Sequence, residues 1–278
     1  MGISRVFSLS RPLSSPSLAG LRGGHYGGAV NYANFPLEAR RQPALNLPPV
    51  IIALSAIMIA VHVLRQFLSQ EADLKVLLWT AFLPARYSHV PVLNGLLPGG
   101  LPADIWTFVT YAFLHGDAIH LAVNLIWFLA FGSAVAWRFG TLRFLLFSAV
   151  TAAAGAAMHL YFFRGDVAPL VGASAAISGA MAAALRFAFE AGGPLGPWRN
   201  SGPEAFRVPA SPLSRALRNP QVLVFLGVWF SLNLLFGLTS AMTNLSEGTV
   251  AWQAHVGGFV AGLLLFPLFD PIRRPTLH

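Results

Sequence analysis

The chain of 278 residues contains no cysteine, and Asp, Glu, Lys and Arg together make up only 10% of it. The missing cysteine excludes disulfides, thiolate metal sites and a cysteine nucleophile. A soluble globular protein carries about 25% charged residues. Hydrophobic residues form 55% of this chain, so too few charges are present to cover a water-facing surface. Global disorder is excluded as well, because it requires low hydrophobicity. The low content of charged residues and the high hydrophobic content together predict a membrane protein.

No carboxylate lies in the interior of a predicted membrane span, where an ion pathway would need one. All ten Asp and Glu residues lie in predicted loops, in the N-terminal segment or at predicted helix ends. Proton and cation pathways usually contain an intramembrane acid, which argues against the alternative of a small transporter or channel. Paired-carboxylate hydrolysis and carboxylate-ligated metals also lack residues here. We expect no metal site and no cofactor.

Six stretches are long and apolar enough for helices that cross a bilayer, which takes about 20 residues each. The predicted fold is therefore an all-α membrane protein, a bundle of six transmembrane helices formed by residues 46–270. The connection 67–118 is half apolar and is expected to rest at the membrane interface. The connection 190–220, rich in Pro, Gly and Arg, is expected to be solvated. The six predicted spans are 47–66, 119–138, 142–163, 168–189, 221–240 and 249–269.

The basic residues are distributed unequally between the connections. If the N-terminus lies in the cytoplasm, 14 of the 18 Lys and Arg, including Arg138, fall on the cytoplasmic side, as the positive-inside rule requires. Both termini are therefore expected in the cytoplasm, with residues 1–45 a disordered basic tail and 271–278 a short C-terminal tail. The net charge of +8 forms no basic cluster interleaved with aromatics, so no nucleic-acid partner is predicted.

The membrane itself is suggested by composition. Arg outnumbers Lys by 17 to 1 and alanine is abundant, which favours a GC-rich bacterial genome and therefore the bacterial inner membrane. The acid-poor, Arg- and Ser-rich tail is also typical of a transit peptide. The mitochondrial inner membrane is the alternative.

Ser174 and His255 stand out among the polar residues of the predicted spans. Gly258 and Gly262 follow His255 at +3 and +7, on the same helix face, and the residues around Ser174 are nearly all small. Small residues on one face let two helices approach closely. A serine and a histidine on two such faces can meet within hydrogen-bond reach, the minimum for an activated nucleophile. Taken alone, the small-residue face around Ser174 is more commonly just a packing surface, and only the pair of faces indicates a site.

His120 and Asn124 form a third element, because their spacing of four residues places them on one helix face. Each side chain can donate an N–H. Two such donors that converge on one point can stabilise a developing oxyanion, by roughly 2.7–4 kcal/mol per donor. The alternative is that they hydrogen-bond neighbouring helices and only hold the bundle together.

These elements together resemble the rhomboid family of intramembrane serine proteases. The resemblance covers about residues 47–270 and leaves residues 1–45 unexplained. It rests on three motifs in the family's order, His-x-x-x-Asn, Gly-x-Ser and Ala-His-x-x-Gly-x-x-x-Gly, which here are His120, Asn124, Gly172, Ser174, Ala254, His255, Gly258 and Gly262, with Phe113, Leu114 and His115 as supporting residues before the first motif.

The resemblance implies a Ser–His dyad that hydrolyses peptide bonds. Ser174 is the expected nucleophile and His255 its general base. Asn124, His120 and the backbone N–H of Ser174 are expected to form the oxyanion hole, and Gly172 to keep the approach to the serine open. The implied partners are transmembrane segments of other proteins, met within the lipid bilayer. The alternative is a non-catalytic relative that binds membrane proteins in the same groove. The sequence does not predict an oligomeric state.

Three positions depart from the family pattern. Ala175 stands where the family often has glycine, and its methyl group is expected to tighten the site. Ser178 replaces an aromatic residue that often packs under the histidine, so support for His255 must come from elsewhere. Thr107 replaces the arginine of a Trp-Arg pair, which leaves the anchoring of the first connection unexplained.

Overall fold

The computed structural model describes residues 46–88, 97–198, 202–243 and 251–272. Within these ranges all regular elements are helices, and the one β contact there is an isolated bridge between Phe82 and Leu170. The predicted all-α class is confirmed. The tail 1–45 and most of 271–278 lie outside the described residues, so both tail predictions remain predictions.

The helical elements follow the predicted spans in order. They are α1 (Pro49–Arg65), α2 (Gln70–Thr80), η2 (Pro84–Tyr87), α3 (Gly100–Thr110), η4 (Tyr111–Phe113), α4 (Ala118–Trp127), η5 (Phe128–Gly132), α5 (Ser133–Phe139), α6 (Thr141–Phe162), α7 (Ser174–Ala184), η6 (Pro203–Arg207), α8 (Leu213–Ala216), α9 (Pro220–Thr243) and α10 (Trp252–Phe269). Here η5 is one π-helical turn, which joins α4 and α5 into a continuous helix.

Three helical stretches of the described chain are long and apolar enough to cross a membrane, namely Ala118–Phe139, Thr141–Phe162 and Trp252–Phe269. Three shorter apolar segments, Pro49–Arg65, Ser174–Ala184 and Pro220–Leu235, occupy the positions of the other predicted spans. The structure thus contains a membrane-type helical bundle. The number of spans and the side on which the termini lie remain predictions.

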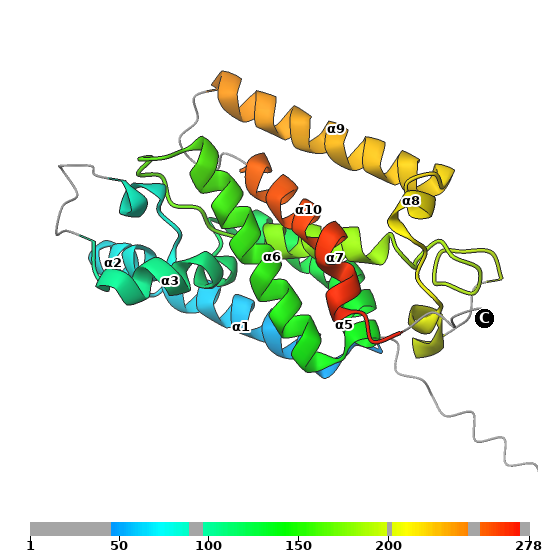
Figure 1. Cartoon of the computed structure of the whole chain (residues 1–278). Coiled ribbons are helices and arrows are strands. Elements are labelled where there is room, and N and C mark those ends of the chain that lie inside the picture. The colour runs from blue at the N-terminus through cyan, green and yellow to red at the C-terminus, as the bar shows by residue number, and fades with distance from the viewer. Residues whose placement is uncertain (1–45, 89–96, 199–201, 244–250, 273–278) are drawn as a thin grey trace, which may run out of the picture. The chain divides into compact units, whose positions relative to one another are not determined.

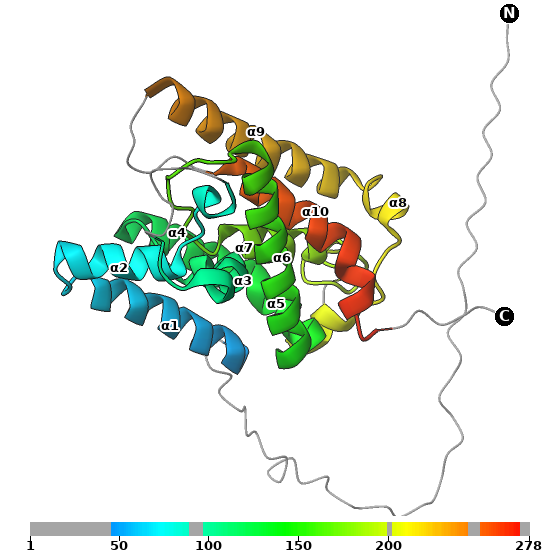
Figure 2. The same cartoon turned by 60° about the vertical axis from the view of Figure 1, so that its left-hand side comes forward.

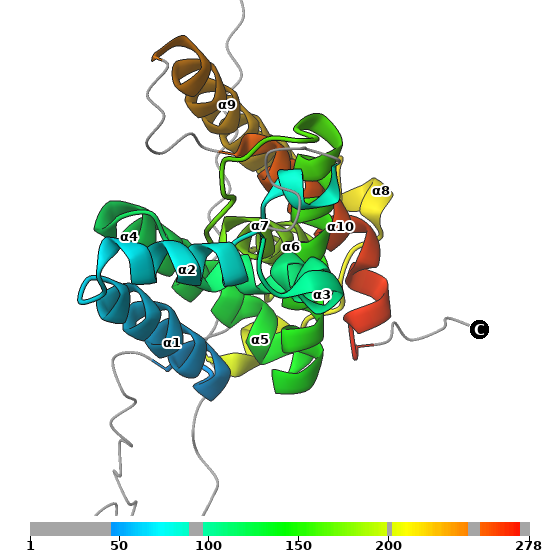
Figure 3. The same ribbon diagram turned by 90° about the vertical axis from the view of Figure 1, so that its left-hand side faces the viewer.

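The centre of the bundle is formed by α6, α7 and α10, which pack against one another. Figures 1, 2 and 3 agree in placing α9 on one side of this group and α1 on the opposite side. Helix α9 packs mainly on α10. This arrangement brings the predicted serine helix and the predicted histidine helix into direct contact.

Glycines set the distance between α7 and α10. A Cβ atom on Gly258 would lie 2.1 Å from the carbonyl oxygen of Ala175, and one on Gly262 would lie 2.3 Å from that of Gly179. Since real Cβ contacts are never that short, glycine is required wherever the two backbones touch. The predicted contact between the two small-residue faces is confirmed.

The fourth predicted span, 168–189, is too long. Helix α7 covers only Ser174–Ala184, and residues 168–171 are extended. Leu170 forms reciprocal backbone hydrogen bonds with Phe82, at 2.8 and 3.2 Å, which take the place of helical ones. Hydropathy alone cannot detect this boundary, because the extended segment is as apolar as the helix.

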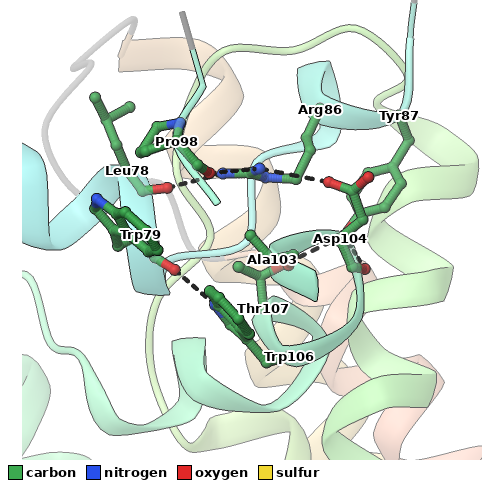
Figure 4. A network of polar contacts seen from close by, with 9 residues as sticks. All are labelled: Leu78, Trp79, Arg86, Tyr87, Pro98, Ala103, Asp104, Trp106 and Thr107. Atoms are coloured by element: carbon green, nitrogen blue, oxygen red, sulfur yellow. Dashed lines mark hydrogen bonds and ion pairs between the residues drawn. The ribbon is translucent and has the colours of Figure 1, made fainter. Parts of the chain in front are cut away.

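The first connection contains short helices rather than another span, and a buried arginine holds it together (Figure 4). The side chain of Arg86 is 3% exposed and pairs with Asp104 at 3.4 Å. Arg86 also donates hydrogen bonds to the carbonyl oxygens of Leu78 (2.8 Å) and Pro98 (3.0 Å). Arg86 therefore supplies the anchoring that the departure at Thr107 left unexplained.

Trp106, also drawn in Figure 4, fixes α3 against α2. The indole N–H of Trp106 donates to the carbonyl oxygen of Trp79 at 2.8 Å, and the two rings are stacked. The hydroxyl of Thr107 donates to the carbonyl oxygen of Ala103 at 2.7 Å and lies 3.1 Å from the hydroxyl of Tyr87. Thr107 thus stabilises its own helix, and the docking of that helix depends on other residues.

The connection 190–220 was expected to be solvated, and this is wrong for part of it. Arg138, at 3% exposure, forms a salt bridge with Asp270 at 2.9 Å and donates to the carbonyl oxygens of Phe206 and Val208. A buried guanidinium needs such partners, because leaving its donors unsatisfied is costly. Arg138 therefore tethers this connection to the bundle, a role that counting it as a cytoplasmic charge did not predict.

Candidate active site

Ser174 is the first residue of α7, and the chain before it is shaped to present its side chain. Gly172 adopts φ +114°, a conformation that L residues rarely adopt. Its N–H donates to the carbonyl oxygen of Tyr111 at 3.0 Å, and Leu170 is held by the bridge to Phe82. Because the first N–H groups of a helix have no intrahelical acceptor, the N-terminus of α7 offers backbone donors beside the serine hydroxyl.

The serine hydroxyl meets the predicted imidazole. The Oγ atom of Ser174 lies 2.7 Å from Nε2 of His255, and both residues are partly exposed. The two residues are 81 positions apart in the chain and are brought together by the glycine contacts between α7 and α10. The predicted meeting of these two side chains is therefore present in the structure. Their catalytic roles remain predictions.

His120 lies beside Gly172, close to the same site. A Cβ atom on Gly172 would be 2.7 Å from Nε2 of His120 and 3.8 Å from Oγ of Ser174. The absent side chain of Gly172 therefore lets the imidazole of His120 lie close to the backbone beside the serine hydroxyl. A potential N–H donor is thus near the predicted nucleophile, and its part in an oxyanion hole stays a prediction.

Asn124 lies one turn after His120 on α4 and is 4% exposed. Its amide nitrogen donates to the carbonyl oxygen of His120 at 2.9 Å, within the same helix. One of its two N–H groups is thus committed to its own helix, and the second remains available as a donor. Its part in an oxyanion hole stays a prediction.

Asn233 is a site residue that the sequence did not single out. It lies on α9 at 8% exposure, and its Oδ1 atom is 2.7 Å from Nδ1 of His255. The hydroxyl of Ser174, the imidazole of His255 and the amide of Asn233 thus form one continuous hydrogen-bonded network across α7, α10 and α9. An asparagine in an apolar helix carries no spacing signal, so only the packing of α9 on α10 shows the contact.

Two of the departures from the family pattern can now be placed. The methyl group of Ala175 faces α6, because a Cβ on Gly155 of that helix would lie 2.4 Å from it. The extra methyl therefore lies in a helix interface and not between Ser174 and His255. Support for the imidazole comes from α9, through Asn233, where Ser178 supplies no aromatic ring.

No three His, Asp or Glu side chains of the described ranges gather as ligands for one metal ion. The hydrogen-bonded chain of a hydroxyl and an imidazole, beside helix N-terminal donors, is suited to nucleophilic attack on a carbonyl.

His115, just before α4, is fully buried, and neither ring nitrogen has a well-formed hydrogen bond within the described ranges. Burial lowers the pKa of His115 from 6.5 to about 4, and the neighbouring His120 and His62 add to the effect. His115 is therefore neutral at pH 7 in the folded protein.

This burial predicts a loss of stability in acid. The unfolded chain protonates His115 near pH 6.5 and the folded chain near pH 4, so unfolding takes up a proton between these values. Stability should fall by about 2 kcal/mol between about pH 7 and pH 5 through this group. His115→Phe fills the same space without titrating, so its thermal midpoint in detergent should depend less steeply on pH. Equal pH slopes for the variant and the wild type would contradict the account.

Comparison with known proteins finds a matching family model and matching curated proteins. A model of the Rhomboid domain matches residues 102–270. The Rhomboid protease GlpG of Klebsiella pneumoniae subsp. pneumoniae is 26% identical over 149 residues, which cover 52% of this chain and 48% of that protein. The chain thus aligns with about half the length of this curated relative.

Proposed function

The chain belongs to the rhomboid family, and from this membership we propose that it is an intramembrane serine endopeptidase that cleaves transmembrane segments of other proteins. The observation that carries the proposal is the 2.7 Å contact between Oγ of Ser174 and Nε2 of His255. It is supported by the close approach of the His120 imidazole to Gly172, beside the hydroxyl of Ser174.

In the proposed acylation step, Oγ of Ser174 attacks the scissile carbonyl carbon while Nε2 of His255 accepts the hydroxyl proton. The carbonyl oxygen becomes an oxyanion, which the backbone N–H of Ser174 and the side chains of His120 and Asn124 stabilise. His255 then gives its proton to the amine nitrogen as the C–N bond breaks. The amine leaves, and the acyl group stays on Ser174.

Water completes the proposed reaction. His255 takes a proton from the water molecule that attacks the acyl carbon, and returns it to Oγ of Ser174 as the acid leaves. A helical substrate hides its carbonyl groups in hydrogen bonds, so cleavage requires local unwinding. Substrates with Gly or Pro near the cleavage site are therefore favoured. With six spans and cytoplasmic termini, Ser174 lies toward the outer face of a bacterial inner membrane, where water is within reach.

The proposal is tested with the purified full-length protein in liposomes, together with a fluorescently labelled transmembrane substrate. We expect two products with wild-type protein and none with Ser174→Ala. Mass spectrometry of the products should place the cut at one end of the apolar segment. If both proteins bind the substrate and neither cleaves it, the binding alternative replaces the protease. If both cleave it equally, the nucleophile is not Ser174.

A further inference from the structure

The support of His255 comes from two contacts that join α9 to α10 one turn apart. Asn233 meets His255 at 2.7 Å, and the ring of Trp229 stacks on that of Phe259 with centroids 4.5 Å apart. Trp229 and Asn233 are four residues apart, as are His255 and Phe259, so the two helices run antiparallel through matched turns. The aromatic stack therefore fixes the position from which the amide reaches the imidazole.

The amide of Asn233 can face the imidazole in only one way. Its nitrogen donates to the carbonyl oxygen of Trp229 at 2.8 Å. If the amide were flipped, its oxygen would face the carbonyl oxygen of Trp229, and two acceptors cannot form a hydrogen bond. The amide nitrogen, which can only donate, therefore faces Trp229. Oδ1 is thus the atom that faces Nδ1 of His255, and it can only accept.

This orientation decides which ring nitrogen of His255 carries the proton. Because Oδ1 of Asn233 accepts, Nδ1 must be the protonated nitrogen in the neutral imidazole. Nε2 then has its lone pair free and faces Oγ of Ser174 at 2.7 Å. This is the tautomer that a general base requires.

We propose that Asn233 is a positioning residue that holds His255 in the tautomer and orientation needed to accept the Ser174 proton. The proposal rests on the proposed protease function, and it extends the expected dyad to a chain of Ser174, His255 and Asn233. A neutral amide suits this location, because an ionised carboxylate is costly inside a membrane. Asn233 orients the ring without placing a negative charge beside the imidazolium. Because a buried acid would also stabilise that cation, turnover with a neutral amide is expected to be slower than with a carboxylate in its place.

Steady-state cleavage of the liposome substrate tests this role first. Asn233→Leu is nearly isosteric and removes the acceptor, so kcat should fall about 10- to 100-fold, the factor expected for loss of one buried hydrogen bond to a reacting group. KM should stay within about twofold, because the lost interaction acts on the chemical step. Asn233→Asp keeps an acceptor toward Nδ1, and in the protonated form that the membrane favours its O–H replaces the amide N–H toward Trp229, so kcat should stay within about fivefold. Leu234→Ala, an exposed neighbour on α9, is the matched control and should cleave as the wild type does.

A spectroscopic measurement separates positioning from a structural role. In protein labelled with 15N-histidine, His255 should show the Nδ1–H tautomer in the wild type and in Leu234→Ala, with its signals assigned by their loss in His255→Gln. In Asn233→Leu the Nε2–H form should appear. An unchanged tautomer in Asn233→Leu, or equal losses of kcat in the Leu and Asp variants, overturns the proposal. Cleavage that survives Ser174→Ala would instead overturn the proposed function, and the tautomer measurement would still decide the role of Asn233.

Discussion

Gly258→Ala is expected to reduce the rate of cleavage about 100-fold and to lower the stability of the bundle. The new Cβ would lie 2.1 Å from the carbonyl oxygen of Ala175 and 3.0 Å from its Cα. These are backbone atoms and cannot rotate away, so α7 and α10 must move apart by about 1 Å. A displacement of that size at a reacting pair costs about 100-fold in rate, and overpacking costs about 1–3 kcal/mol. Cleavage kinetics and the thermal midpoint in detergent measure the two effects.

Gly227→Ala is the matched control for this prediction. Gly227 lies within α9, is exposed, and has no atom within 4 Å of the position of a Cβ. The variant should cleave normally and be slightly more stable, since alanine is favoured over glycine in helices by about 1 kcal/mol. Normal cleavage by Gly258→Ala as well would show that the close contact between α7 and α10 does not position the site.

Gly172→Ala is expected to reduce kcat about 100- to 1000-fold, the loss that follows removal of one oxyanion donor. Its Cβ would lie 2.7 Å from Nε2 of His120 and 3.8 Å from Oγ of Ser174, so it would displace the imidazole that is proposed as an oxyanion donor. Parts of the substrate bound away from His120 are affected less, so kcat should fall more than the affinity for substrate. Cleavage kinetics and a substrate-binding measurement on the same protein separate the two.

Gly140→Ala controls for backbone strain. Gly140, between α5 and α6, has φ +75° and no atom within 4 Å of a Cβ. An alanine there would adopt an unfavourable backbone conformation without contacting other atoms. The variant protein should therefore lose some stability and keep its kcat. If Gly172→Ala loses no more kcat than Gly140→Ala, the close approach of His120 to Gly172 does not contribute to catalysis.

The helix contacts and helix boundaries that depend on periodicity and on small side chains could be predicted from the sequence. The spacing of Gly258 and Gly262 after His255 correctly indicated a close helix contact, because each glycine opposes a backbone carbonyl. The predicted boundaries of most spans lie within a few residues of the observed helices. The pairing of Ser174 with His255 followed from these faces together with the family motifs.

The remaining features depend on tertiary packing that no local pattern encodes. Arg138 was counted only as a cytoplasmic charge and Arg86 was not singled out, yet the side chains of both are buried and bind backbone carbonyl groups of distant segments. The start of α7 at Ser174 depends on the bridge between Phe82 and Leu170. The amide of Asn233 acquires its partner only because α9 packs on α10 in one register.

The most direct test of the central claim is the chemical reactivity of Ser174. Purified protein is treated with a fluorophosphonate, and the modified residue is identified by peptide mass spectrometry. We expect one adduct, on Ser174, that forms far more slowly in His255→Ala and is absent in Ser174→Ala. An adduct on another residue, or equal labelling of Ser174 with and without His255, would contradict the account.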